Sequence, residues 1–197
     1  MTVQESAPAD EALAQRAQRG ERQAFDLLIR RHKSALYRLV RRYVGDADDA
    51  YDILQDALVS VWEGLERYDA GRSFLAWTRV IALNKCRDFS RRRRFRRLIL
   101  DAFASEPAPV TSPAPSEQND EQAATARQDL RLRCLDEAIA ALPALYKDPM
   151  VLTTAGGLTQ EAAAAVLKTT PKAVEMRLRR ARRKLMEALS PPPEGQT

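Results

Sequence analysis

The sequence has few of the residues on which metal sites, disulfide frameworks and phosphate-binding loops are built. Its 197 residues include two cysteines, one histidine and seven glycines. Cys86 and Cys134 lie far apart in apolar helical patterns, so we interpret them as buried, reduced thiols and not as a disulfide or a metal clip. The chain shows no Gly-rich phosphate loop, no paired Cys/His cluster and no nucleophile beside a base. We therefore expect no metal, no cofactor and no enzymatic activity.

The single histidine argues against a histidine-based metal or catalytic site, and the short apolar runs argue against a membrane-spanning protein. His32 lies on the apolar stripe of an expected helix, which favours a place at the core or its edge over a metal or catalytic role. No apolar run is long enough to span a bilayer, and the N-terminus MTVQESAPADE has no apolar signal core. We expect a cytoplasmic protein without membrane insertion.

The sequence is rich in helix-forming residues and in charge of both signs. Ala, Leu and Arg are abundant, 30% of the residues are charged, and alternating β-branched runs are missing. This composition predicts an all-α fold. The formal net charge of +5 conceals a segregation, because arginine is concentrated in two places while the acids lie elsewhere. That distribution indicates a polyanion such as nucleic acid as a partner.

The stretch DDAYDILQDALVSVWEGL, residues 48–65, is the most clearly divided of the expected helices. Its apolar residues, among them Ile53, Trp62 and Leu65, fall on one half and are predicted to face a core. The opposite half carries Asp49, Asp52, Gln55, Asp56 and Glu63. Most acidic stripes of this kind are solvated helix faces. The alternative is a docking surface for a positively charged protein, since charge complementarity aligns such contacts.

The first arginine cluster, RDFSRRRRFRRL, occupies residues 87–98. It continues a helix that Ser73 can cap and whose Trp77 and Phe89 are predicted to point inward. Like charges at this spacing repel each other, so we expect an anion to offset the repulsion, most naturally a phosphate backbone. A disordered basic tail is the less favoured alternative, because the apolar residues anchor the start of the cluster.

A change of composition divides the chain in two. Residues 102–126 are rich in Pro, Ala, Ser and acids and contain no Lys or Arg. Such a segment cannot bury enough apolar surface to become ordered. We predict two small helical domains, residues 10–100 and 127–190, joined by a flexible acidic linker, residues 101–126.

The second domain has the pattern of a helix-turn-helix unit. A first helix is predicted to stop at Pro143. Asp148-Pro149 is interpreted as a cap and a first-turn proline that open a short helix, which ends at Gly156-Gly157. Thr159 is predicted to cap the next helix.

The last helix of this domain is basic and begins at Thr170-Pro171. An apolar face of Val174, Leu178, Ala181 and Leu185 is predicted to pack inward. A helix with the opposite, arginine-rich face can enter a major groove, where arginine reads guanine edges and binds phosphates.

Three stretches together resemble a known family. They are DAYDILQDALVSVW, FLAWTRVIALNKCRDFSRRRR and the segment LPALYKDPMVLTTAGGLTQEAAAAVLKTTPKAVEMRLRRARRKL. They resemble the extracytoplasmic-function (ECF) group of the sigma-70 family of bacterial RNA polymerase sigma factors. The chain departs from the family pattern at Lys168, where a turn glycine is usual, and at Pro171, which stands one position late. Glu175 and Met176 are also unusual.

The resemblance implies a sigma factor that directs core RNA polymerase to a set of promoters. The domain of residues 10–100 corresponds to sigma domain two, which is expected to bind the minus-ten element and help to melt it. The domain of residues 127–190 corresponds to sigma domain four, which is expected to read the minus-thirty-five element. The residues expected to dock on the clamp helices of the largest polymerase subunit are Asp49, Asp52, Gln55, Asp56 and Glu63. Those expected at the minus-ten element are Arg72, Ser73, Asn84, Lys85, Arg87, Arg91, Arg92, Arg93 and Arg94. Those expected at the minus-thirty-five element are Thr170, Lys172, Glu175, Met176, Arg177, Arg179, Arg180 and Arg183.

The resemblance also implies that domain four contacts the polymerase flap, that an anti-sigma factor controls the protein in a stress response, and that it works at the nucleoid. Two rivals remain. A stand-alone helix-turn-helix regulator would bind operators without polymerase, usually as a symmetric dimer. An RNA-binding protein or RNA-processing enzyme would need exposed stacking aromatics or a carboxylate–metal cluster.

Overall fold

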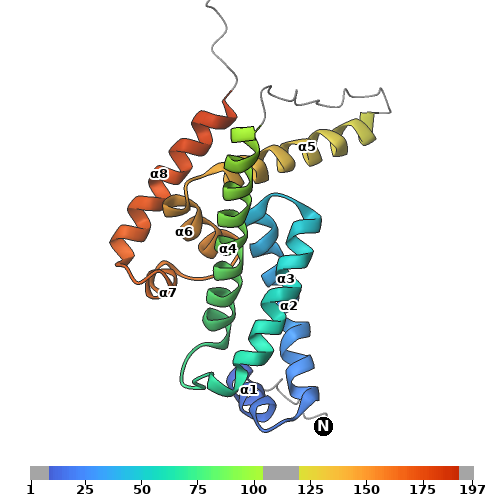
Figure 1. Ribbon diagram of the computed structural model, residues 1–197, viewed down its shortest axis with the longest axis vertical. Coiled ribbons are helices and arrows are strands. Elements are labelled where there is room, and N and C mark those ends of the chain that lie inside the picture. Colours follow the sequence, from blue (N-terminus) through green and yellow to red (C-terminus); the bar gives the residue numbers. More distant parts are fainter. Residues whose placement is uncertain (1–8, 104–119, 191–197) are drawn as a thin grey trace, which may run out of the picture.

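The structure is a computed structural model that describes residues 9–103 and 120–190, and the side chains of residues 9–100 and 130–190. Within these ranges it consists of helices and turns without a strand (Figure 1), which confirms the predicted all-α fold. The helices are α1 Asp10–Gln18, α2 Arg22–Val44, α3 Ala47–Gly64, the 3-10 turn η1 Leu65–Arg67, α4 Phe74–Phe103, α5 Asp120–Ala141, α6 Ala144–Thr154, α7 Gln160–Val166 and α8 Pro171–Leu189.

The N-terminal helices α1–α4 form a bundle in which α2, α3 and α4 pack against one another. Gly45 ends α2 in the left-handed conformation, at φ 84°, which glycine adopts without steric cost. The Asp46 carboxylate then accepts hydrogen bonds from the backbone N–H groups of Asp48 and Asp49, at 2.9 and 3.0 Å, and caps α3. This joint turns the chain back so that the apolar half of α3 meets α2 and α4.

The lone histidine lies at the edge of this bundle, as predicted. His32 is 8% exposed, and its Nε2 lies 2.6 Å from Oδ2 of Asp10 in α1. The contact ties α1 to α2.

The C-terminal helices α6–α8 form the predicted helix-turn-helix unit. The hydroxyls of Thr159 and Thr170 accept hydrogen bonds from the backbone N–H groups of Ala162 and Ala173, each at 3.2 Å. The predicted cap Thr159 is confirmed, and Thr170 caps the helix that it was predicted to begin. In the turn before α8, Lys168 has φ 51°. This left-handed conformation costs an L-residue about 1–2 kcal/mol, and a glycine at this turn would avoid the cost.

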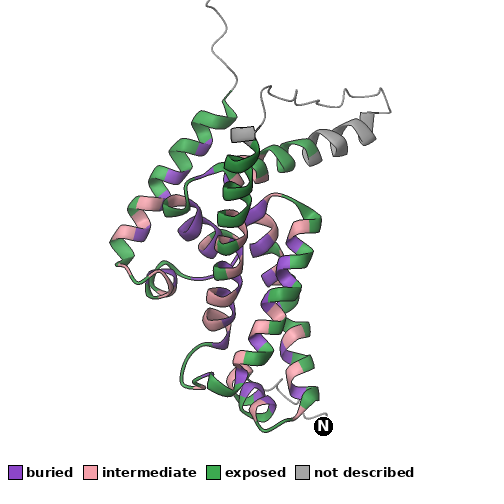
Figure 2. Ribbon diagram, viewed as in Figure 1, coloured by how far each residue is buried: buried purple, intermediate pink, exposed green. Residues whose placement is uncertain are grey.

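The two sets of helices pack together through α2, which contacts α5 and α6, and through α4, which contacts α6 and α7 (Figure 1). One apolar core is shared between them (Figure 2). Tyr43 and Cys86 contribute from the N-terminal helices, and Val151 and Leu152 contribute from α6. Burial raises the pKa of the Cys86 thiol to about 12, so the thiol stays protonated and serves as an apolar side chain.

The interpretation of Asp148-Pro149 as a helix start is wrong. Helix α6 begins at Ala144, directly after Pro143, and Pro149 lies inside it. The local signal was overridden because α6 buries residues 147–152 in the shared core, and packing of that size outweighs one lost backbone hydrogen bond.

Two further expectations from apolar patterns are corrected. Cys134 is exposed on α5, not buried. Trp62 is 45% exposed and packs its ring edge-on against Phe25, with 4.8 Å between the ring centroids. Both residues lie at the margin of an apolar stripe, where one helical position decides between core and surface.

The predicted linker lies mostly outside the described residues. Helix α4 continues to Phe103 and α5 begins at Asp120, before the predicted start of the second domain at residue 127.

Candidate polymerase and nucleic-acid interfaces

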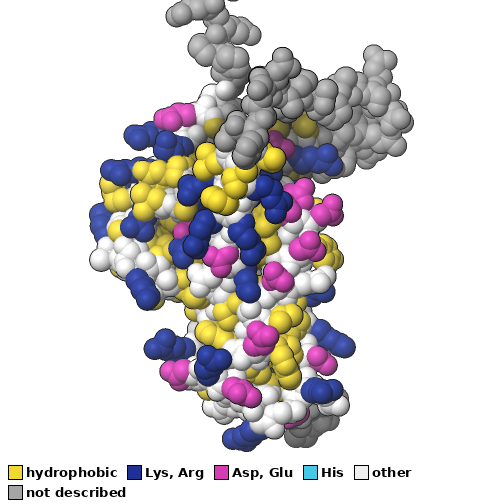
Figure 3. Space-filling view, in the orientation of Figure 1, with side chains coloured by type: hydrophobic (Ala, Val, Ile, Leu, Met, Phe, Trp, Pro, Cys, Tyr) yellow, Lys and Arg dark blue, Asp and Glu magenta, His cyan; other side chains and the backbone are white. Residues whose placement is uncertain are grey.

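The acids of α3 lie on its outer side. Asp52, Gln55, Asp56 and Glu63 are exposed and Asp49 is partly exposed, while Ile53 and Leu54 of the same helix are buried. Asp49, Asp52, Gln55, Asp56 and Glu63 are called the acidic face below. Figure 3 shows acidic side chains gathered over α3, beside a strip of Lys and Arg side chains over α4.

Apolar side chains border the acidic face. Tyr51, Val59 and Trp62 are 53%, 55% and 45% exposed, on the flank of α3 beside the acids. A solvated helix face needs no such residues, whereas protein interfaces are enriched in aromatic side chains. The arrangement therefore favours the docking interpretation, although sequence periodicity alone had placed Trp62 in the core.

The joint before α4 is an ordered turn. Oδ1 of Asp69 accepts a hydrogen bond from the backbone N–H of Gly71 at 2.9 Å, and Oδ2 lies 3.4 Å from Nε of Arg72. The Tyr68 hydroxyl donates to the carbonyl oxygen of Arg72, and burial raises the pKa of Tyr68 to about 12, so it remains a donor. Exposed Arg72 and Ser73 therefore stand on a fixed loop, and Ser73 caps α4 through the N–H of Ala76 at 3.3 Å.

Only part of the predicted minus-ten set shares one face of α4. Asn84, Arg87, Arg91 and Arg94 follow each other at three- and four-residue steps and line up along the helix. Arg92 leaves the helix in another direction. Arg93 borders the same groove as Arg91 and Arg94, and it also reaches 3.7 Å from Asp49 of the acidic face. Lys85 is partly buried.

This α4 face, formed by Asn84, Arg87, Arg91 and Arg94, borders a groove of about 870 Å³. Its arginines Arg87, Arg91 and Arg94 line the groove together with Arg93 and Arg97 of the same helix, and residues between Ala140 and Lys147 and at the end of α2 complete the lining. Arg87 is partly exposed and pairs with a carboxylate of α6. Its Nε and Nη2 donate to Oδ2 of Asp148 in α6, at 3.0 and 2.5 Å.

The basic face of α8 is open to solvent. Lys172, Met176, Arg179, Arg180 and Arg183 are exposed, while Val174, Leu178, Ala181 and Leu185 are buried as predicted. Arg177 is only partly exposed and lies toward the buried side. Thr170 serves as the N-cap of the helix.

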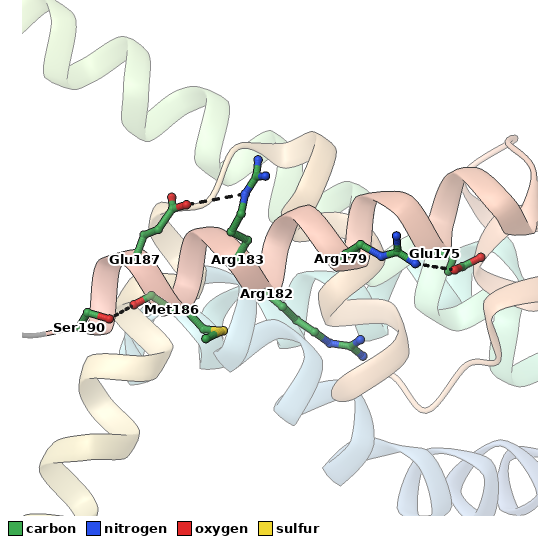
Figure 4. A pocket seen from close by; sticks show the side chains of 7 residues that line it. All are labelled: Glu175, Arg179, Arg182, Arg183, Met186, Glu187 and Ser190. Atoms are coloured by element: carbon green, nitrogen blue, oxygen red, sulfur yellow. Dashed lines mark hydrogen bonds and ion pairs between the residues drawn. The ribbon is translucent and has the colours of Figure 1, made fainter.

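A carboxylate is held among the cations of α8. Glu175 lies 2.9 Å from Nζ of Lys172 and 3.3 Å from Nη2 of Arg179. The hydrogen bond from Lys172 lowers the pKa of Glu175, so it is ionised at neutral pH. Figure 4 shows Arg179 turned toward Glu175 along α8, and Arg182 and Arg183 leaving opposite sides of the helix. These residues line a pocket together with Met186 and Glu187.

Sequence reasoning missed the residues that join the two sets of helices. Arg79 is 3% exposed and donates through Nε to the carbonyl oxygen of Gly156. Its burial lowers its pKa to about 10. Nε of Arg42 lies 2.7 Å from Oδ1 of Asp136. Nothing local in the sequence marks these residues, because each partner lies far along the chain.

Among the described residues, no helix is long and apolar enough to cross a membrane. The same part of the chain contains no group of three or more His, Cys, Asp or Glu side chains that could hold a metal ion.

Two segments match known families. The Sigma-70 region 2 family matches residues 28–96, which include the acidic face and the α4 face. The Sigma-70, region 4 family matches residues 132–185, which include most of α8.

Relatives cover almost the whole chain. RNA polymerase sigma factor NccH of Alcaligenes xylosoxydans xylosoxydans is 35% identical over 180 residues, 91% of this chain and 94% of that protein. RNA polymerase sigma factor CnrH of Cupriavidus metallidurans is 37% identical over 182 residues, 92% of this chain and 94% of that protein.

Solved structures have the same architecture. CnrH in complex with the cytosolic domain of CnrY has a TM-score of 0.67 at 32% identity, over 93% of this chain and 100% of that chain. The sigma factor RpoE in complex with the anti-sigma factor NepR from Bartonella quintana has a TM-score of 0.60 at 24% identity, over 84% of this chain and 96% of that chain. The second comparison supports the fold.

Proposed function

This chain belongs to the ECF group of the sigma-70 family and is an RNA polymerase sigma factor that directs promoter-specific transcription initiation. We propose that three of its surfaces bind different partners. The acidic face binds the clamp helices of core polymerase. The α4 face binds the minus-ten element, and α8 reads the minus-thirty-five element. The protein acts as an initiation factor and catalyses no reaction itself.

The proposal that the acidic face binds core polymerase rests on the exposure of this face. Its carboxylates stand outside the core beside exposed Tyr51, Val59 and Trp62. Carboxylates can align a basic partner, while the aromatic and aliphatic side chains supply area to bury against it. This combination fits a protein partner better than it fits DNA, whose phosphates the acids would repel.

The DNA proposals rest on the two basic surfaces. On α4, Asn84 can read a base edge, because an amide offers a donor and an acceptor together, while Arg91 and Arg94 bind phosphates. The fixed loop with Arg72 and Ser73 is placed to hold an unstacked base. The exposed α8 face fits a major groove, in the manner of a recognition helix.

The domain boundaries that we propose are those predicted from the composition of the sequence. Residues 10–100 form domain two and residues 127–190 form domain four, which contacts the polymerase flap. Residues 101–126 join them.

Control by an anti-sigma factor is part of the proposal. CnrH, at 32% identity, is seen in complex with the cytosolic domain of another protein, CnrY. We also propose that the protein acts in the cytoplasm at the nucleoid. Its family membership favours these roles over a stand-alone regulator, which would ignore polymerase.

Core binding and transcription by charge-reversed variants test the proposal. Asp52→Arg with Asp56→Arg should abolish binding to core RNA polymerase and run-off transcription, because positive charge then meets a basic partner surface. Circular dichroism should be unchanged, since both residues are exposed. The matched control is Glu137→Arg with Glu187→Arg, which makes the same change in net charge on α5 and α8 and should keep core affinity. Full core affinity of the Asp52→Arg, Asp56→Arg variant would refute the docking assignment.

A further inference from the structure

A side chain of α1 binds the backbone at the point where α3 ends and the loop before α4 begins. Nε2 of Gln18 donates hydrogen bonds to two carbonyl oxygens, those of Leu65 at 2.9 Å and Tyr68 at 2.7 Å. A side-chain amide has two N–H donors, so it can serve both acceptors at once. Leu65 and Tyr68 are the C-cap residues of α3 and of η1. Gln18 therefore holds both ends of this short turn.

These two bonds answer a need of helix ends. The last carbonyl groups of a helix have no partner inside the helix, and side chains or water must satisfy them. Here the donor comes from a helix that lies 47 and 50 residues earlier in the chain than its two acceptors. The bonds of Gln18 therefore fix where the chain stands when it leaves η1.

Tyr68 transmits this restraint to the loop of residues 69–73, which is called the base-holding loop below. Tyr68 is 4% exposed, and its ring packs against Trp77 of α4 with 4.8 Å between the ring centroids. Its hydroxyl donates to the carbonyl oxygen of Arg72. The N–H of Arg72 donates to the carbonyl oxygen of Asp69 at 2.9 Å and closes the loop on itself. The loop can thus move as one unit, and Tyr68 anchors it.

Helix α1 is a firm support for Gln18. Figure 1 shows α1 at the end of the bundle where α3 connects to α4, and α1 contacts both η1 and α4. Leu13 and Ala17 of α1 are buried in the same apolar cluster as Leu65. At the other end of α1, Oδ2 of Asp10 lies 2.6 Å from Nε2 of His32 in α2. Packing and this contact hold the helix from which Gln18 projects.

We propose that Gln18 is a positioning residue for promoter recognition, whose two hydrogen bonds place the base-holding loop where it discriminates an unstacked base of the minus-ten element. The inference rests on the proposed role of this loop in holding such a base. A base edge is read by hydrogen bonds, which weaken steeply when donor and acceptor are misaligned. A small displacement of the loop therefore changes the choice of base, whereas core polymerase binds at the acidic face of α3. Gln18 acts through Tyr68 and not through a contact of its own with DNA.

Transcription in vitro by core RNA polymerase and the full chain measures the base preference. The templates are variants of one promoter that the native protein recognises, with each of the four bases at every position of the minus-ten and minus-thirty-five elements. Gln18→Met keeps the length of the side chain and removes both donors. At one minus-ten position it should lower the ratio of transcription between the preferred base and the others at least about threefold, a part of the discrimination that one good base contact supplies. The ratios at the minus-thirty-five element should stay native.

Gln15→Met is the matched control, because Gln15 is exposed on the same helix. It should leave every ratio unchanged. A loss of folded protein lowers transcription from all templates by the same factor, so native ratios for Gln18→Met would make Gln18 a structural residue only and would overturn the inference. Should Gln18→Met fail to fold, seen by circular dichroism, Gln18→Asn keeps an amide that is too short to reach both carbonyl oxygens, and the same ratio decides.

A variant of the loop itself separates the inference from the proposed role of the loop. Arg72→Ala with Ser73→Ala should change the ratio at the same minus-ten position as Gln18→Met. If the loop variant does so while Gln18→Met and Gln18→Asn keep native ratios, the loop holds the base and the positioning role of Gln18 is wrong. If none of these variants changes a ratio, the loop does not discriminate a base, and both proposals fail.

Discussion

Glu175 is the most unusual residue on the basic face of α8, because it places a carboxylate on a surface whose other charged residues can bind phosphates. Lys172 and Arg179 hold it, at 2.9 and 3.3 Å, and keep it ionised. A carboxylate at this position repels phosphate and can accept a hydrogen bond from the amino group of cytosine. Glu175 therefore fits a role in selecting bases better than a role in affinity.

Glu175→Gln should change which base is preferred. Glutamine recognises adenine through two hydrogen bonds, so one position of the minus-thirty-five element should shift from cytosine toward adenine, by about 1–3 kcal/mol of discrimination. Transcription from promoters that carry each base at each position of the element measures the shift. Glu187→Gln makes the same charge change farther along α8, where Glu187 pairs with Arg183 at 3.7 Å, and should leave the preference unchanged. An unaltered base profile for Glu175→Gln would remove Glu175 from the reading set.

The structural role of a residue could be predicted from the sequence where its neighbours along the chain determine that role. The caps Ser73, Thr159 and Thr170 each act on the backbone N–H three residues farther along the chain, so their roles follow from the local pattern. The environments of Asp148 and Trp62 depend on partners distant in the sequence. Asp148 therefore looked like a cap, and Trp62 looked like a core residue.

Helix α4 shows how one element divides its charges. Its arginine run is interrupted only by Phe95, but the helical period separates Arg91, Arg93, Arg94 and Arg97, which line the groove with Arg87, from Arg92 and Arg96, which do not line it. The sequence predicted the cluster as a whole, and the helix geometry selects within it. We therefore expect arginines on the α4 face to contribute more to DNA binding than their neighbours.

Arg91→Ala with Arg94→Ala should weaken promoter opening and reduce its dependence on salt. Each lost phosphate contact lowers the slope of log affinity against log salt concentration by about 0.7–0.9. Holoenzyme binding to promoter fragments, measured over a series of salt concentrations, gives this slope. Arg92→Ala with Arg96→Ala removes the same charge from the other side of α4 and should change the slope less. Equal slopes for the two double variants would show that the run acts as a diffuse charge and not as an oriented face.

At the scale of the whole molecule, the sequence predicted two helical units but not their contact. Each helix carries a periodic apolar stripe, so the elements could be predicted, whereas two stripes of similar length do not reveal which helices meet. The shared core of Tyr43, Cys86, Val151 and Leu152, and the buried Arg79 and Lys147, appear only in three dimensions. The interface buries the cations Arg79 and Lys147, which are 3% and 7% exposed, and this burial lowers the pKa values of both side chains.

Substitutions at two glycines separate the effect of the contact between the domains on stability from the effect of local backbone strain. Gly20 and Gly45 both adopt left-handed conformations, at φ 92° and 84°. A Cβ added at Gly20 would meet nothing within 4 Å, whereas one added at Gly45 would lie 3.1 Å from Cβ of Ala140 in α5. Gly20→Ala should therefore cost only the backbone strain, about 1–2 kcal/mol. Gly45→Ala carries the same strain and also presses α5 away from the end of α2. It should lower the midpoint of thermal unfolding further than Gly20→Ala does. If the two variants lose the same stability, the closed packing of domain four on domain two is not the state of the free protein in solution.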